Sequence, residues 1–194
     1  MLATERRLAI RLESLTVGWN AIEAVVAIAG GAAAGSVALV GFGLDSVVEV
    51  SAALVVLWQF FGIAEERERR ALRLIGGSFF ALAAYVTVSS LYDLATRSEP
   101  HASRVGIILT AVSLVAMPAL AIVKRRAGQR IGSRTLVADS TQTRLCAYLS
   151  ATTLAGLAAN AAFGWWWADP LAALVIAYVA ITEGREAWRG DTCC

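Results

Sequence analysis

The chain has 194 residues, of which 58% are hydrophobic and only 16% are charged, and its formal net charge is +2. The mean hydropathy of +0.64 lies well above that of soluble domains. The composition therefore excludes a sizeable soluble domain and indicates an integral membrane protein within a lipid bilayer. We expect no enzymatic activity, no organic cofactor and no nucleic-acid partner.

Apolar runs of about 20 residues or somewhat longer divide the sequence into six predicted membrane spans. No run alternates with the period of two residues that the wall of a β-barrel requires, so the spans are predicted to be α-helices. The predicted fold is a single all-α transmembrane domain over residues 1–194, without a soluble domain. The predicted spans are residues 13–33, 37–61, 74–93, 104–123, 137–163 and 166–184.

Most Lys and Arg residues fall in three clusters, before the first predicted span, after the second and after the fourth. Lys and Arg accumulate in short loops on the cytoplasmic side of a membrane. This pattern predicts that both termini lie in the cytoplasm, and we expect a multi-pass protein of a bacterial-type inner membrane. The clusters comprise Arg6, Arg7 and Arg11; Arg67, Arg69, Arg70 and Arg73; and Lys124, Arg125, Arg126, Arg130 and Arg134.

Two carboxylates, Asp45 and Glu49, lie inside the second predicted span, and no other charged residue occurs from Ala24 to Ala64. A charged side chain in the hydrocarbon core costs at least about 2.5 to 3.5 kcal/mol, so something must compensate these two groups. Residues four apart on a helix face nearly the same way, and a divalent cation would draw both carboxyls into the ionised form. The alternative is a structural pair of hydrogen-bonded carboxyl groups.

The first predicted span also carries polar residues, Asn20 and Glu23, which lie three apart and therefore on roughly one face. Glu23 is a further intramembrane carboxylate. Two interpretations remain open: these residues line a transport pathway, or Glu23 pairs with a polar group on a neighbouring helix.

Asp139, Gln142 and Cys146 lie in the fifth predicted span at offsets of three and seven residues, which places them on one stripe. This helix could thus present oxygen and sulfur ligands toward Asp45 and Glu49. A single buried Cys is more often a small hydrophobic residue, so the spacing alone does not identify Cys146 as a ligand.

Asp169 and Pro170 open the last predicted span. Proline is tolerated in the first turn of a helix, and a carboxylate is favourable at that end. We therefore expect Asp169 to act as a helix cap.

At these residues the chain resembles the cation diffusion facilitator family. The resemblance implies a protein of six transmembrane helices that exports divalent metals. The resemblance covers all six spans and is strongest at Leu44-Asp45-Ser46-Val47-Val48-Glu49, which is similar to the acidic pair of the family's second span. It implies a homodimer. Further similarities lie at Asn20, at Gly35-Ser36-Val37-Ala38-Leu39 and at Gly164-Trp165-Trp166-Trp167-Ala168-Asp169-Pro170.

The sequence departs from the family pattern in two places. The family has a His and an Asp four residues apart in span five, where this chain has Gln142 and Cys146. The chain also ends at Cys194, soon after the last predicted span, so we expect the family's cytoplasmic carboxy-terminal domain to be absent. The role of the terminal pair, Cys193 and Cys194, is left open.

These observations lead to the hypothesis of a divalent metal efflux transporter that works by alternating access. The predicted site consists of Asp45, Glu49 and Cys146, together with either Gln142 or Asp139. A thiolate favours Zn²⁺, Co²⁺ or Cd²⁺ over Mg²⁺ or Ca²⁺, and Fe²⁺ and Mn²⁺ are further candidate substrates. Protons are the expected counter-ion, because carboxylates and a thiol lose protons when they bind metal.

Two other functional classes remain open. One is a non-transporting membrane protein, either a metal sensor or an assembly subunit. The other is a channel-like cation pathway lined by Glu23, Asp45 and Glu49. Saturable transport coupled to a gradient would distinguish the transporter from both.

Overall fold

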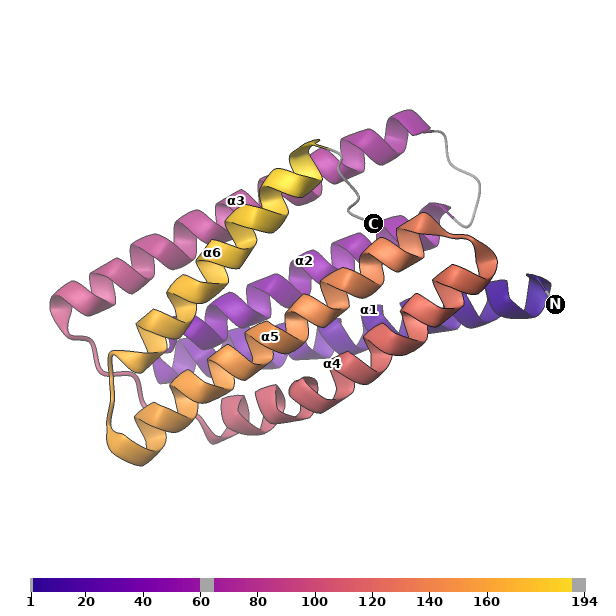
Figure 1. The fold of residues 1–194 in the computed structure, drawn as a ribbon. Helices are drawn as coiled ribbons and strands as arrows, with labels where there is room; N and C mark the ends of the chain where they lie inside the picture. Colours follow the sequence, from indigo (N-terminus) through magenta and orange to yellow (C-terminus); the bar gives the residue numbers. More distant parts are fainter. Residues whose placement is uncertain (1, 60–64, 190–194) are drawn as a thin grey trace.

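The computed structural model describes residues 2–59 and 65–189. The described residues form six α-helices that run alternately up and down a single bundle (Figure 1). The predicted all-α fold with six helices is therefore confirmed. The helices are α1 (Leu2–Ala34), α2 (Val37–Gln59), α3 (Glu65–Thr96), α4 (Arg104–Ile131), α5 (Arg134–Phe163) and α6 (Ala168–Arg189).

Three helices extend well beyond the spans that hydropathy predicts. α1 begins 11 residues before residue 13, and α3 and α4 also continue into charged sequence. At 1.5 Å per residue, the 33 residues of α1 measure about 50 Å, whereas the hydrocarbon core is about 30 Å thick. Hydropathy detects only the part of a helix that lies in the hydrocarbon, which explains the difference. Predicted residues 60–61 of the second span and the pair Cys193 and Cys194 lie outside the described residues.

In the described part of the chain, five of the helices are long and apolar enough to cross a membrane. They are all helices except α6, which has Asp169 and Pro170 at its start and Glu183 and Arg185 near its end. Its apolar stretch is correspondingly short. The start of α1 and the end of α6 lie at the same end of the bundle, with the α4–α5 turn and the start of α3 (Figure 1). The basic clusters of the sequence lie at this end, which we name the basic end. The five apolar helices make the chain a multi-pass membrane protein.

The opposite end of the bundle is held together by short turns and polar contacts. Gly35, between α1 and α2, has a φ of 68°, a left-handed conformation that glycine adopts without steric cost. Ser36 follows and accepts a hydrogen bond from the Leu39 amide at 3.1 Å, which caps α2. The His101 amide donates to the Ala34 carbonyl at 2.8 Å, so the α3–α4 loop lies against the end of α1.

Asp169 connects the first turn of α6 to the start of α2. Its carboxylate accepts a hydrogen bond of 2.5 Å from the Ser36 hydroxyl and one of 3.2 Å from the Ala38 amide. Its hydrogen bonds thus come from α2, a neighbouring helix, whereas the sequence suggested a cap for the last span itself. The reason is tertiary: the amino ends of α2 and α6 meet at this end of the bundle.

α3 packs chiefly against α6, while α1 packs against α2 and α4 against α5. Small residues permit these close approaches. A methyl group added at Gly43 would lie 2.9 Å from the Ala27 side chain, and one at Gly76 would lie 3.0 Å from the Gly184 carbonyl oxygen. The bundle therefore consists of a four-helix group, α1, α2, α4 and α5, and the α3–α6 pair beside it (Figure 1).

Candidate functional site

The interior of the four-helix group is unusually polar for a membrane protein. On α1, buried polar residues recur at spacings of three and four, and α5 has a similar stripe. Such spacing places them on the face of each helix that points into the bundle. The α1 stripe contains Glu13, Thr16, Asn20 and Glu23, and the α5 stripe contains Asp139, Thr143, Cys146, Ser150 and Thr153.

Asp45 and Glu49 lie on the inner face of α2, and their exposed fractions are 8% and 1%. Both oxygens of Glu49 are buried and have no hydrogen-bond partner among the described residues. Asp45 is in the electrostatic range of Glu49, of Glu23 on α1 and of Glu183 on α6. The acidic pair is therefore buried and faces further carboxylates, and hydrogen bonds do not compensate Glu49.

Glu23 is held by two hydroxyl groups. Ser46 on α2 donates to one carboxylate oxygen at 2.9 Å, and Ser113 on α4 donates to the other. These are the partners that structural pairing requires, and they connect α1, α2 and α4. A role for Glu23 in the transport pathway stays a prediction.

Asn20 lies at the level of Glu49. Glu23 on α1 accepts a hydrogen bond from Ser46 on α2, and the two helices are antiparallel. Asn20, three residues before Glu23, is therefore at about the same level as Glu49, three residues after Ser46. Asn20 is fully buried, and both its side-chain oxygen and its nitrogen lack a hydrogen-bond partner among the described residues. Buried polar atoms without partners are rare, and an ion or a water is one explanation for them.

The α5 stripe brings Cys146 toward the acidic pair. The Cys146 side chain is 1% exposed and lies in the electrostatic range of Glu49, Glu23 and Asp45. Thr143 and Cys146 both face Glu49, but neither forms a hydrogen bond with good geometry to it. Gln142 is only half-buried, because the inward positions of α5 are 139, 143 and 146.

Asp139 is engaged with a lysine at the basic end of the bundle. The Lys124 ammonium on α4 is fully buried, forms an ion pair with the Asp139 carboxylate and donates to the Glu13 carboxylate on α1 at 3.2 Å. It also donates to Thr143 Oγ1 at 3.3 Å. Asp139 therefore already has a cationic partner in this structure, whereas Glu49 has none in direct contact within the described part of the chain.

The sequence reasoning missed Glu13, Lys124 and Glu183. A signal was present for two of them. Glu13 continues the spacing of Asn20 and Glu23, and Lys124 continues the buried stripe of Thr110, Ser113, Met117 and Ala121. Lys124 had been counted with the exposed basic cluster because it adjoins Arg125 and Arg126.

The predicted residues are thus brought together only in part. Asp45, Glu49 and Cys146 are buried on α2 and α5 within electrostatic range of one another, whereas Asp139 pairs with Lys124. In the described ranges, no group of three or more His, Cys, Asp or Glu side chains is close enough to hold a metal ion in this conformation. The donors in this region are carboxylate, amide and thiol groups, which are types of ligand that suit a transition-metal dication.

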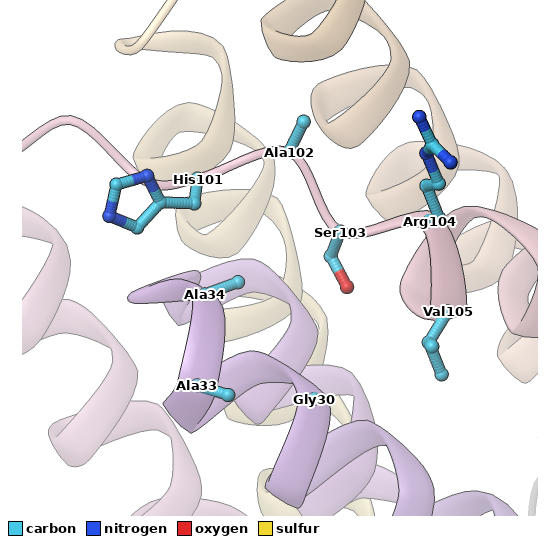
Figure 2. A pocket seen from close by; sticks show the side chains of 8 residues that line it. All are labelled: Gly30, Ala33, Ala34, His101, Ala102, Ser103, Arg104 and Val105. Atoms are coloured by element: carbon cyan, nitrogen blue, oxygen red, sulfur yellow. The ribbon is translucent and has the colours of Figure 1, made fainter.

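A separate cavity of about 410 Å³ opens at the end of the bundle opposite the basic end. Figure 2 shows that it lies between the end of α1 and the α3–α4 loop, with the Ser103 hydroxyl directed toward α1. This hydroxyl accepts a hydrogen bond from the Gly106 amide at 3.1 Å, so it caps α4. His101 is exposed there, in the loop between α3 and α4. The lining residues are Gly30, Ala33, Ala34, His101, Ala102, Ser103, Arg104 and Val105.

Comparison with known proteins agrees with this picture. The chain is 26% identical over 167 residues to an uncharacterized transporter of Synechocystis, covering 80% of this chain and 54% of that protein. It is 25% identical over 138 residues to transmembrane protein 163 of Xenopus laevis, covering 69% and 49% of the two chains. It is 35% identical over 72 residues to the cation-efflux pump FieF of Shewanella oneidensis, covering 37% and 24%. The chain thus spans about half the length of the first two relatives and about a quarter of the third.

The family match covers nearly the whole chain. Residues 15–189 match the cation efflux transmembrane domain. This range includes all the site residues described above except Glu13, and it agrees with the resemblance inferred from the acidic pair of the second span. The chain therefore belongs to the cation efflux family, that is, the cation diffusion facilitators.

Proposed function

We propose that this protein is a transporter that exports a divalent metal cation by alternating access. The single observation that supports it most is the buried acidic pair Asp45 and Glu49, in which neither Glu49 oxygen has a hydrogen-bond partner among the residues that the structure describes. A dication would compensate the charges of two buried carboxylates in an apolar surrounding. The family match supports the same function, because the matched domain is one of cation efflux.

The proposed ligands are Asp45 and Glu49 from α2 and Cys146 from α5, with Asn20 of α1 as a further oxygen donor. Of the two alternatives for the remaining ligand, Gln142 is half-buried and Asp139 pairs with Lys124, so each would have to move to reach the site. The thiol supports a substrate such as Zn²⁺, Co²⁺ or Cd²⁺, and Fe²⁺ and Mn²⁺ are the harder candidates.

Alternating access requires two groups of helices that move relative to each other. The four-helix group carries Asp45, Glu49 and Cys146, while Glu183 on α6 of the α3–α6 pair lies within electrostatic range of Asp45. A relative movement of the two groups would change the access to Asp45. We propose proton antiport, because the carboxylates and the thiol release protons when metal binds and regain them when it leaves. A homodimer in the membrane, with both termini in the cytoplasm, completes the proposal.

Transport should be measured with the full chain reconstituted in liposomes. We expect saturable Zn²⁺ flux. The flux should increase when protons are driven across the membrane in the opposite direction, and the lumenal pH should change as Zn²⁺ moves. Flux that does not saturate would instead indicate a channel-like pathway. Zn²⁺ binding without any flux would indicate a sensor or an assembly subunit.

Replacing Cys146 with serine should change the metal preference more than it changes transport itself. The substitution exchanges a soft sulfur donor for a harder oxygen of similar size, so Cd²⁺ affinity should fall by a larger factor than Mn²⁺ affinity. Competition binding of both metals to the purified variant would measure this. Ser150→Ala, one turn further along the same stripe, is the control. Equal losses for the two metals would show that the thiol is not a ligand.

A further inference from the structure

The most unusual group outside the proposed metal site is the ammonium of Lys124. It is fully buried and contacts three residues on two neighbouring helices: Glu13 on α1 at 3.2 Å, Asp139 on α5, and Thr143 Oγ1 on α5 at 3.3 Å. We name Glu13, Lys124 and Asp139 the charged triad. Burying an ion pair costs hydration free energy, which the contacts between the charged groups must offset. These contacts therefore fix the position of the Lys124 ammonium.

The charged triad has more negative than positive groups. When all three groups are ionised, two carboxylates face one ammonium, which leaves one net negative charge. Glu13 Oε1 and Asp139 Oδ1 are both buried without a hydrogen-bond partner among the described residues. The single ammonium therefore compensates both carboxylates only in part.

The charged triad lies within electrostatic range of the proposed metal site. Thr143, which the Lys124 ammonium contacts at 3.3 Å, lies only three residues from the proposed ligand Cys146 on the same buried stripe of α5. Glu49 lies within the electrostatic range of both Lys124 and Asp139, whose charges have opposite signs. Charges in a protein interior interact over longer distances than in water, because the effective dielectric constant is lower. A change in the net charge of the triad must therefore change the free energy of a cation beside Glu49.

We propose that Lys124 is an internal counter-ion that limits the affinity of the Asp45 and Glu49 site for its metal substrate. This inference rests on the proposed function. A transporter must bind its cation strongly enough to collect it and weakly enough to release it. Two uncompensated carboxylates and a thiol in a low-dielectric interior would hold a dication too strongly, and the nearby ammonium repels that dication. Lys124 acts through the electric field and does not touch the metal.

The test compares Zn²⁺ affinity, by calorimetry on purified full-length protein, among variants that change the net charge of the charged triad. Lys124→Gln makes the triad more negative and should tighten binding about tenfold, a typical coupling between sites. Asp139→Asn makes it less negative and should weaken binding by a similar factor. The double variant Lys124→Gln with Asp139→Asn restores the original net charge and should return the affinity close to that of the unaltered protein.

Two controls separate charge from shape and from total charge. Lys124→Arg keeps the charge and should keep the affinity. Arg126→Gln removes an exposed charge two residues further along α4 and should leave the affinity unchanged.

Affinities that do not follow the net charge of the triad overturn the inference. In particular, a double variant as weak as Asp139→Asn would mean that Asp139 is a direct ligand. If Lys124→Gln does not fold, the comparison of Asp139→Asn with the double variant decides the question. If the unaltered protein neither binds nor transports Zn²⁺, the proposed function is refuted. If it binds Zn²⁺ and the affinity does not change with the net charge of the triad, only the role of Lys124 is refuted.

Discussion

Replacing Asp45 with Asn and Glu49 with Gln in one variant should lower Zn²⁺ affinity by at least about 100-fold. Loss of a residue that only supports a ligand already costs about 10-fold to 100-fold, and here two proposed direct ligands lose their charge. The amide replacements keep the size of the side chains, and the four-helix group should stay folded because no hydrogen bond from Glu49 to another described residue would be lost. Calorimetry on the purified variant measures the affinity, and liposome flux should fall in parallel.

The matched control for this experiment is Asp93→Asn. Asp93 is a half-buried carboxylate on α3, outside the four-helix group. The Asp93→Asn variant should bind and transport Zn²⁺ like the unaltered protein. If the double variant elutes as a single folded species and keeps its affinity, the acidic pair is not the metal site.

Replacing Asp169 with alanine should destabilise the fold by about 2 to 3 kcal/mol. The substitution removes an acceptor that is only 1% exposed and leaves the Ser36 hydroxyl and the Ala38 amide without their partner. Hydrogen bonds to a charged group contribute more than neutral ones, and the carboxylate also interacts favourably with the amino end of α2. Unfolding by SDS titration, followed by circular dichroism, would measure the change in the free energy of unfolding.

Two comparisons make this result specific. Asp169→Asn keeps one side-chain oxygen as an acceptor and should lose less stability than the alanine variant. Glu186→Ala removes an exposed carboxylate from the same helix and should change the stability by no more than about 0.5 kcal/mol. Equal stability of the Asp169 and Glu186 alanine variants would contradict the connection between α2 and α6.

The helices could be predicted from the sequence because the bilayer imposes a strict rule on backbone hydrogen bonds. The starts of α2 at Val37 and of α4 at Arg104 coincide with the predicted starts. The polar continuations of α1 and α3 could not be predicted in this way, since hydropathy does not distinguish a helix in water from a loop. α6 shows the converse: the sequence predicts a span at residues 166–184, but the apolar stretch of α6 is short and α6 is not among the five helices that are long and apolar enough to cross a membrane.

The candidate site could be predicted only where the information is local. The four-residue spacing of Asp45 and Glu49 is a property of one helix, and the structure places both on its buried face. The partner of Asp139 is a tertiary property, because Lys124 lies on another helix and beside residues that are exposed. Gln142 and its neighbour Thr143 differ in direction by about 100° around the helix. The sequence therefore predicts Gln142 on the inner face only if that face is placed on the wrong side of position 146, and the structure has Thr143 there instead.

The hydrogen bonds of Asp169 have a mechanical consequence for the whole bundle. They join the amino ends of α2 and α6 at the end opposite the basic end, while α6 also packs along α3. Helices are stiff on the length scale of a membrane, so fixing one end of α6 leaves rotation about that point as its main remaining freedom. The displacement of any residue then grows with its distance from Asp169. Glu183, almost four turns further along α6, therefore lies where a small rotation produces a large displacement of a carboxylate relative to Asp45.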